Sequence, residues 1–131
     1  MSEKVADKLI QIRNKHQDSV YFFADLKTKE CYIEENQCLP KELMAQGSDI
    51  LLSLYNGKCV IPEDMGKMIN LYERIVQGVK EPIHMEELQT FFRMYTDDDR
   101  IHLFSIICFL NVDEFGLIDS YAGKIWMMKK Q

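Results

Sequence analysis

Two segments with a two-residue hydrophobic period flank a central segment with helical periodicity, and this order constrains the fold most. Residues 20–26 and residues 88–95 alternate side chains between two faces. Between them, residues 40–78 repeat apolar side chains every three or four positions. A strand has a period of two and an amphipathic helix a period of 3.6, so strands, then helices, then strands are predicted. This order is typical of an α+β domain with helices packed on one face of an antiparallel sheet.

Five strands are expected from the alternating segments and the turns between them. Residues 20–26 and 31–34 are separated by a short polar connection, which predicts an antiparallel hairpin. Further strands are predicted at residues 87–95, 101–110 and 117–128, separated by turns rich in Asp and Gly. Residues 101–110 are nearly all apolar, which is typical of a central strand covered on both faces.

The central segment predicts two short helices and one long helix. Pro40 suits the start of the first helix, and Gly47 its end. Ser48 or Asp49 can cap the second. The long helix is predicted from Pro62 to Gly78, with acidic side chains in its first turn, where they complement the helix dipole.

A further amphipathic helix is predicted before the first strand, over residues 2–16. This divides the chain into a flanking helix at residues 1–17 and one α+β domain at residues 18–131. Val5, Leu9 and Ile12 form a narrow apolar stripe on this helix, outside the five-strand core. We expect the stripe to form a homodimer interface, the alternative being that the helix packs back on its own sheet.

The composition bounds the class of protein. The 131 residues suffice for one core, and 16 Lys and Arg against 21 Asp and Glu give a net charge of −5. Without a block of clustered cations, binding to a nucleic-acid backbone is not expected. The sequence has no apolar run long enough to span a membrane and no signal-peptide core at its start, so a cytoplasmic location is expected.

No residue cluster points to a metal or to covalent catalysis. The four cysteines include no C-x-x-C pair, and the three histidines, His16, His84 and His102, show no metal-ligand spacing. Three consecutive carboxylates at residues 97–99 predict a solvent-facing turn, because a calcium loop needs alternate spacing and a distal Glu. We expect no metal, and no glycine-rich phosphate loop or nucleophile elbow is present.

Several local motifs, in this order, resemble a PAS domain, the sensory module of many bacterial signalling proteins. The resemblance covers residues 18–128 and is strongest to the subgroup whose long helix starts at "H-P-E-D". At three motif positions the chain differs: Ile61 stands in place of His, Asp99 in place of Gly, and the Trp expected after that turn is absent, with Leu103 or Phe104 nearby instead. The motifs are the opening hairpin at 20–29, Ile61-Pro62-Glu63-Asp64 with Val76-Gln77-Gly78, the strand and turn at 87–99, and Asp113-Glu114-Phe115-Gly116 before the closing strand.

The resemblance implies a five-stranded antiparallel sheet and a noncatalytic sensory domain. Some PAS domains hold haem through a histidine on the long helix, but residues 62–77 contain none. Flavin-binding relatives use a Cys in an "N-C-R-F-L-Q" stretch, which residues 36–41 match only in scattered letters. No cofactor is therefore expected.

The expected function is binding of a small ligand or partner, which shifts the packing of helix against sheet and signals to a linked output domain. The end of the sequence just after the last strand suggests an input domain of a longer protein, of the diguanylate cyclase, phosphodiesterase or histidine kinase type. Alternatives are a homodimerisation adaptor with a filled core and a small cone-shaped α+β enzyme using Asp25 or His84. The predicted ligand-binding residues, mostly apolar as in concave sites, are Phe22, Met68, Tyr72, Phe92 and Ile107.

Overall fold

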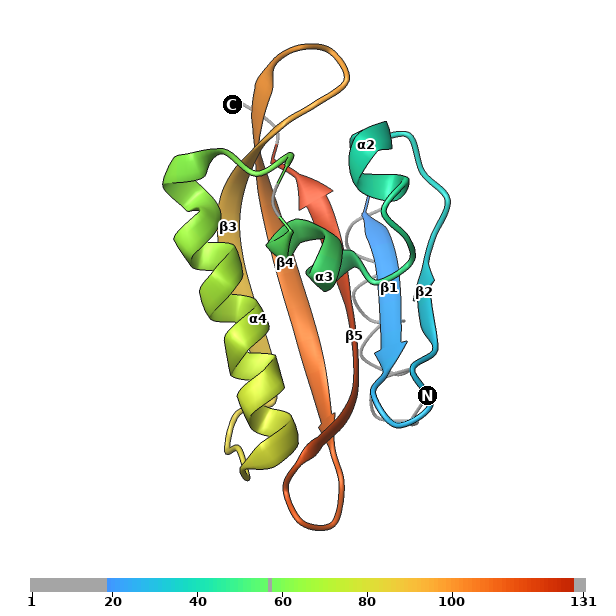
Figure 1. Ribbon diagram of the computed structural model, residues 1–131, viewed down its shortest axis with the longest axis vertical. Helices are drawn as coiled ribbons and strands as arrows, with labels where there is room; N and C mark the ends of the chain where they lie inside the picture. The colour runs from blue at the N-terminus through green and yellow to red at the C-terminus, as the bar shows by residue number, and fades with distance from the viewer. Residues whose placement is uncertain (1–18, 57, 129–131) are drawn as a thin grey trace.

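One antiparallel sheet of five strands organises the chain, with all the described helices on one of its faces (Figure 1). The structure is a computed structural model and describes residues 19–56 and 58–128. The strand order is β2-β1-β5-β4-β3, so the last strand lies in the middle of the sheet between the first and the fourth. The predicted α+β class and five-stranded sheet are confirmed. The strands are β1 (Val20–Asp25), β2 (Cys31–Ile33), β3 (Glu87–Tyr95), β4 (Ile101–Val112) and β5 (Ile118–Met127).

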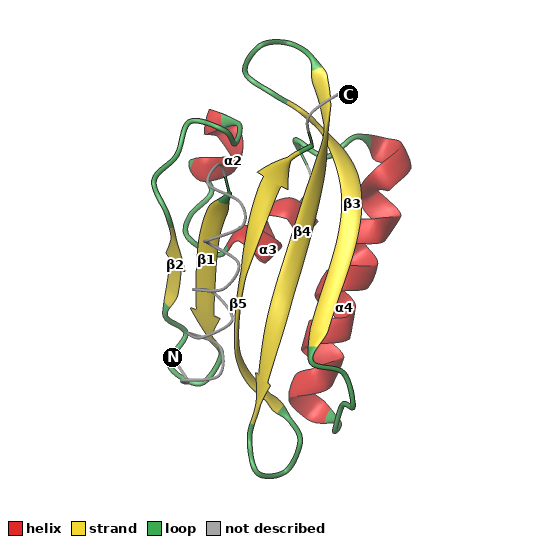
Figure 2. Cartoon of the chain, turned by 180° about the vertical axis from the view of Figure 1, so that it is seen from behind, coloured by secondary structure: helices red, strands yellow, loops and turns green. Residues whose placement is uncertain are grey.

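The helices lie behind the sheet when the molecule is viewed from the opposite side (Figure 2). They are α2 (Lys41–Met44), α3 (Ile50–Tyr55), the 3-10 turn η1 (Pro62–Asp64) and α4 (Met65–Lys80). Asp49 caps α3, as predicted, because its carboxylate accepts a hydrogen bond from the Leu52 N–H at 3.2 Å. None of the described helices is both long and apolar enough to span a membrane.

The predicted end of the long helix at Gly78 is wrong, because α4 continues to Lys80. Gly78 is buried inside the helix, where a Cβ atom would clash with the side chain of Ile118 on β5. The glycine therefore allows the helix and the sheet to approach closely, which is a different use of this residue from a helix stop.

The predicted turns are confirmed, and each of the three places one residue in the left-handed region; in the β1–β2 turn this is Lys29, with φ 67°. Gly116 has φ 80°, and the Asp113 carboxylate accepts hydrogen bonds from the N–H groups of Phe115 and Leu117. Asp99 has φ 62° at the position where the PAS subgroup has glycine. Aspartate tolerates this conformation better than most residues, so the turn forms without glycine.

The core lies between the sheet and the helices. Every second residue of each long strand points into it, and α3 and α4 cover these residues with their apolar faces. Core side chains on the helix-covered face include Phe22, Ala24, Leu88, Phe92, Met94, Phe104, Ile106, Cys108, Tyr121 and Ile125, packed against Leu43, Leu54, Met68, Leu71 and Ile75.

The predicted helix over residues 2–16, and with it the predicted domain boundary at residue 17, lies outside the described residues.

Candidate functional site

Three of the five predicted ligand-binding residues lie together in the core. Phe22 on β1, Met68 on α4 and Phe92 on β3 belong to one buried cluster, and each is at most 2% exposed. Tyr72, one turn after Met68 on α4, packs at the margin of this cluster and stays partly exposed. Four of the predicted residues, from β1, β3 and α4, therefore lie in one region of the structure.

The fifth predicted residue, Ile107, lies on the opposite face of the sheet. Its cross-strand partners are Gln89 and Lys124, whereas its neighbours Ile106 and Cys108 point into the core and are fully buried. Successive side chains of a strand point to opposite faces, so Ile107 cannot line the same space as Phe92. The nearly continuous apolar run of β4 gave no alternation from which to read its inward face.

Aromatic rings occupy the space between the centre of the sheet and the helices. The Phe22 ring lies over Gly123 on β5, where a Cβ atom would come within 2.8 Å of its Cζ. Phe22 meets Tyr121 edge to face, with ring centroids 6.3 Å apart. Phe92 stacks on Phe104 at 6.0 Å. Edge-to-face and offset-stacked contacts of this kind are the arrangements that buried aromatic rings prefer.

Few polar groups reach this core. The Tyr121 hydroxyl donates to the Asp49 carboxylate at 3.5 Å, and burial raises the pKa of this phenol. Burial also raises the pKa of the Cys108 thiol, so both groups are neutral at physiological pH. The Ser105 hydroxyl lies on the opposite face of the sheet and accepts a hydrogen bond from the Gln89 side chain at 3.2 Å.

A cleft of about 500 Å³ opens beside the core where α3 ends against α4. Tyr55 and Tyr72 stack there with ring centroids 4.5 Å apart. Val76 adds an apolar wall, and Glu73, Gln77, Lys80 and Glu81 form the rim. Tyr72 also packs against the core, so its side chain is shared between this cleft and the buried cluster.

Asp64 forms an ion pair that the sequence reading missed. Its carboxylate is buried and accepts hydrogen bonds from the Arg93 N–H at 2.7 Å and from the Arg93 guanidinium at 2.9 and 3.0 Å. The bonds from Arg93 hold the pKa of Asp64 below its usual value. The pair ties η1, at the start of α4, to β3. An acidic residue at a helix start predicts a dipole interaction, and nothing in the local sequence identifies a partner 29 residues away.

The acid–base candidates of the enzyme alternative do not form a reactive pair. Asp25 accepts hydrogen bonds from the N–H groups of Lys27 and Thr28, and these bonds lower its pKa. Its carboxylate therefore serves the β1–β2 turn as an ionised acceptor and is a poor base near neutral pH. His84 lies exposed in the loop after α4.

The carboxylates at residues 97–99 organise a turn, as predicted. Asp98 accepts hydrogen bonds from the Thr96 hydroxyl and from the Arg100 N–H, and it pairs with His102 at 2.8 Å. The Thr96 bond contributes most to lowering the pKa of Asp98 to about 2. Asp97 accepts from the Lys41 N–H at the start of α2.

Solved structures share this arrangement of strands and helices. A histidine kinase domain from Haloarcula marismortui, for which light and redox sensing has been suggested, superposes with a TM-score of 0.61 at 13% identity, covering 93% of this chain and 99% of that one. The N-terminal domain of a diguanylate cyclase with a PAS/PAC sensor, from Marinobacter aquaeolei, gives 0.55 at 12% identity, covering 83% and 94%. The chain has a PAS fold.

A third solved structure extends the comparison to a LOV protein. The LOV protein of Rhodobacter sphaeroides gives a TM-score of 0.53 at 13% identity, covering 100% of this chain and 70% of that one. No family model matches the sequence, and no curated protein is significantly similar to it. At such identities the likeness establishes the PAS fold and leaves the ligand to be argued from this chain's own residues.

Proposed function

We propose that this chain is a noncatalytic, cytoplasmic PAS sensory domain whose input alters the packing of α3 and α4 against the sheet. A small apolar ligand would enter beside Tyr72 and displace side chains around Phe22, Met68 and Phe92. A linked output domain, of the histidine kinase or diguanylate cyclase type found with similar folds, would receive the change. Ile107 is not part of this proposal, because it lies on the other face.

The observation that best supports this proposal is the cleft between α3 and α4, because Tyr72 belongs to both the cleft and the core. The Met68 side chain behind it is flexible and can repack around a guest. A guest that binds one packing better than another shifts the population toward that packing. The few polar groups of this region suit recognition by shape with one or two orienting hydrogen bonds.

The first test is a native mass spectrum of the purified chain, followed by thermal melting with any small molecule it retains. Retention of one molecule that raises the melting temperature supports the sensor. A Tyr72→Ala variant should lose this stabilisation, whereas Tyr32→Ala, an exposed tyrosine on the edge strand β2, should keep it. No retained molecule, together with a tight dimer, would instead favour the adaptor.

We also propose that the chain forms a homodimer through residues 2–16. The proposal rests on the apolar stripe of Val5, Leu9 and Ile12 in the sequence, in a segment outside the described residues. Leu9→Glu should shift the mass measured by light scattering toward the monomer, because a carboxylate in an apolar contact is desolvated without a partner. A variant that remains dimeric would place the interface elsewhere.

A further inference from the structure

The outer edge of β3 faces away from β4. At one end of this edge, called the closed end, the main chain is hydrogen-bonded to other segments, and at the other end, called the open end, it is not bonded within the described residues. Near the closed end, the Arg93 C=O accepts from the Ile61 N–H at 3.1 Å and the Tyr95 N–H donates to the Cys59 C=O at 2.9 Å. The Arg93 N–H donates to Asp64. The main-chain groups of these two β3 residues therefore point away from β4.

The same orientation continues toward the start of the strand. The β3–β4 register runs without interruption from Glu87 to Tyr95, so every second residue repeats the orientation of Arg93. Gln89 and Phe91 therefore also direct their N–H and C=O groups outward. Within the described ranges, these four groups have no hydrogen-bond partner. Such a row of unpaired main-chain groups is a template for another strand.

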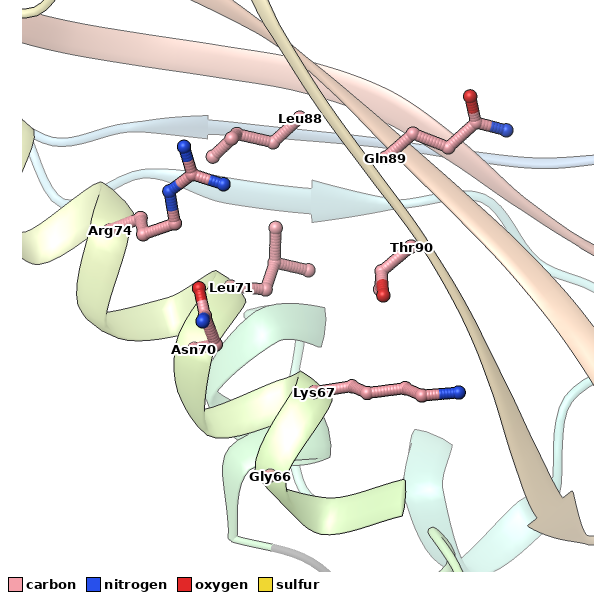
Figure 3. A pocket seen from close by; sticks show the side chains of 8 residues that line it. All are labelled: Gly66, Lys67, Asn70, Leu71, Arg74, Leu88, Gln89 and Thr90. Atoms are coloured by element: carbon pink, nitrogen blue, oxygen red, sulfur yellow. The ribbon is translucent and has the colours of Figure 1, made fainter.

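A cleft of about 330 Å³ runs between this open edge and α4 (Figure 3). Leu71 and Leu88 are buried and form its apolar base, and Thr90 lies beside them. The Gln89 side chain points away from the cleft in Figure 3 and bonds Ser105 on the other face, so Gln89 lines the cleft with its main chain.

The opposite wall of the cleft carries two cations. Lys67 and Arg74 are seven residues apart on α4, which is two helical turns and about 10 Å along one side of the helix. Asn70 lies between them. The Arg74 guanidinium contacts the Met85 sulfur at 3.5 Å, and Lys67 lies 3.8 Å from Asp64, whose carboxylate is already bonded by Arg93. In a chain of net charge −5, this cleft is a local concentration of positive charge and hydrogen-bond donors.

We propose that the cleft between α4 and β3 binds an extended acidic peptide of a partner protein, which adds a strand to β3. The peptide main chain would pair with Gln89 and Phe91, and its acidic side chains would face Lys67 and Arg74. Strand addition in this way takes its affinity from main-chain bonds and its specificity from alternate side chains. Acidic residues two or four positions apart lie on one face at about 7 or 14 Å, which brackets the separation of the two cations.

The experiment selects peptides from a phage-displayed random library of about eight residues against the whole chain, a length that matches an ordinary strand. Enrichment of peptides with acidic residues at alternate positions is expected. Arg74→Gln should weaken binding of the selected peptide about twofold to fivefold, as for a partly exposed ion pair. The matched control is Lys27→Gln, which removes the same charge from the exposed β1–β2 turn, outside both this cleft and the cleft at Tyr72, and it should leave the affinity unchanged.

The binding mode is tested by amide NMR with the selected peptide. Formation of the added strand should shift the Gln89 and Phe91 amide signals and slow their hydrogen exchange, and a proline at the centre of the peptide should abolish the effect. The proposal is overturned by failure to enrich acidic peptides, by equal binding to Arg74→Gln and wild type, or by unchanged Gln89 and Phe91 exchange. Binding of citrate or pyrophosphate without such peptides would make the cleft a small-anion site and would also overturn it.

Discussion

The core behind α3 and α4 and the open edge of β3 differ in how they could receive a binding partner. In the core, Phe92 and Phe104 are fully buried, and a guest has to displace side chains. At the edge, Gln89 and Phe91 already direct main-chain donors and acceptors outward beside a preformed cleft. A molecule that enters the core must change the packing of the domain, whereas one that binds the edge can do so without repacking.

This difference bears on where a signal can originate. Binding that requires repacking is coupled to conformation by its nature, because only a changed arrangement accommodates the guest. Binding at the edge extends the sheet and suits assembly with another protein. The two proposals therefore place sensing in the core and docking at the edge.

The largest expected effect contrasts two neighbouring phenylalanines of β3. Phe92→Ala should destabilise the domain by about 3–5 kcal/mol, because it opens a cavity beneath α4. Phe91 is 44% exposed on the other face, so Phe91→Ala should cost less than about 1 kcal/mol. Urea unfolding measures both. Similar costs for the two variants would contradict the separation of a packed core from an accessible edge.

Two proline substitutions test the orientation of the β3 main chain. Thr90→Pro removes a donor that pairs with β4 and should cost about 3 kcal/mol. Gln89→Pro removes an outward donor, and since edge positions of this kind tolerate proline, it should cost roughly 1 kcal/mol. The free energy of unfolding of each variant is measured. A larger loss for Gln89→Pro than for Thr90→Pro would contradict the claim that Gln89 directs its N–H away from β4.

Loss of the closed end of β3 should have a moderate effect. Asp64→Ala removes the acceptor for three bonds from Arg93 and should destabilise by about 2 kcal/mol. Glu63→Ala, at the exposed neighbouring position, is the control and should change little. Hydrogen exchange should accelerate at the Arg93 amide in the Asp64 variant alone. Unchanged exchange there would mean that Asp64 does not close the edge.

The pH dependence of this ion pair should be the smallest effect. The pKa of Asp64 is lowered in the folded state, so its contribution is present above the unfolded pKa of about 4 and is lost as the pH falls through the folded value. Wild type should therefore lose more stability than Asp64→Asn between about pH 6 and about pH 3. Both chains keep Asp25 and Asp98, whose pKa values are also lowered, so the difference isolates Asp64. Parallel pH profiles would contradict this assignment.

The fold could be predicted from local patterns because periodicity, caps and turns act over a few residues. Asp49 capped its helix as expected, and the alternation of β3 identified Phe92 as inward. The side of the sheet on which Ile107 lies could not be predicted, because a strand with apolar residues on both faces lacks the polar and apolar alternation that identifies its inward face. The role of Gly78 inside α4 could not be predicted either, because the glycine makes room for Ile118, which lies 40 positions later in the sequence.

The site could be predicted only where its residues belong to periodic elements. Phe22, Met68 and Phe92 converge because each lies on the apolar face of its own strand or helix. The cleft at β3 could not be predicted from the sequence. Its main-chain N–H and C=O groups at Gln89 and Phe91 are available only because β3 lies at the edge of the sheet, and this depends on the strand order. The pairing of Asp64 with Arg93 depends on the same tertiary arrangement, which a single sequence does not encode locally.

The most direct measurement of the central claim is an amide NMR screen of the chain against a library of small apolar and aromatic fragments. The account predicts that binding fragments shift signals of Tyr72 and Met68 together with core residues of β1 and β3, while the signals of Tyr32 on β2 stay unchanged. Such a pattern would show that a guest enters beside α4 and alters the packing of helix on sheet. Fragments that perturb only exposed residues, or a spectrum unchanged by every fragment, would contradict a sensory core.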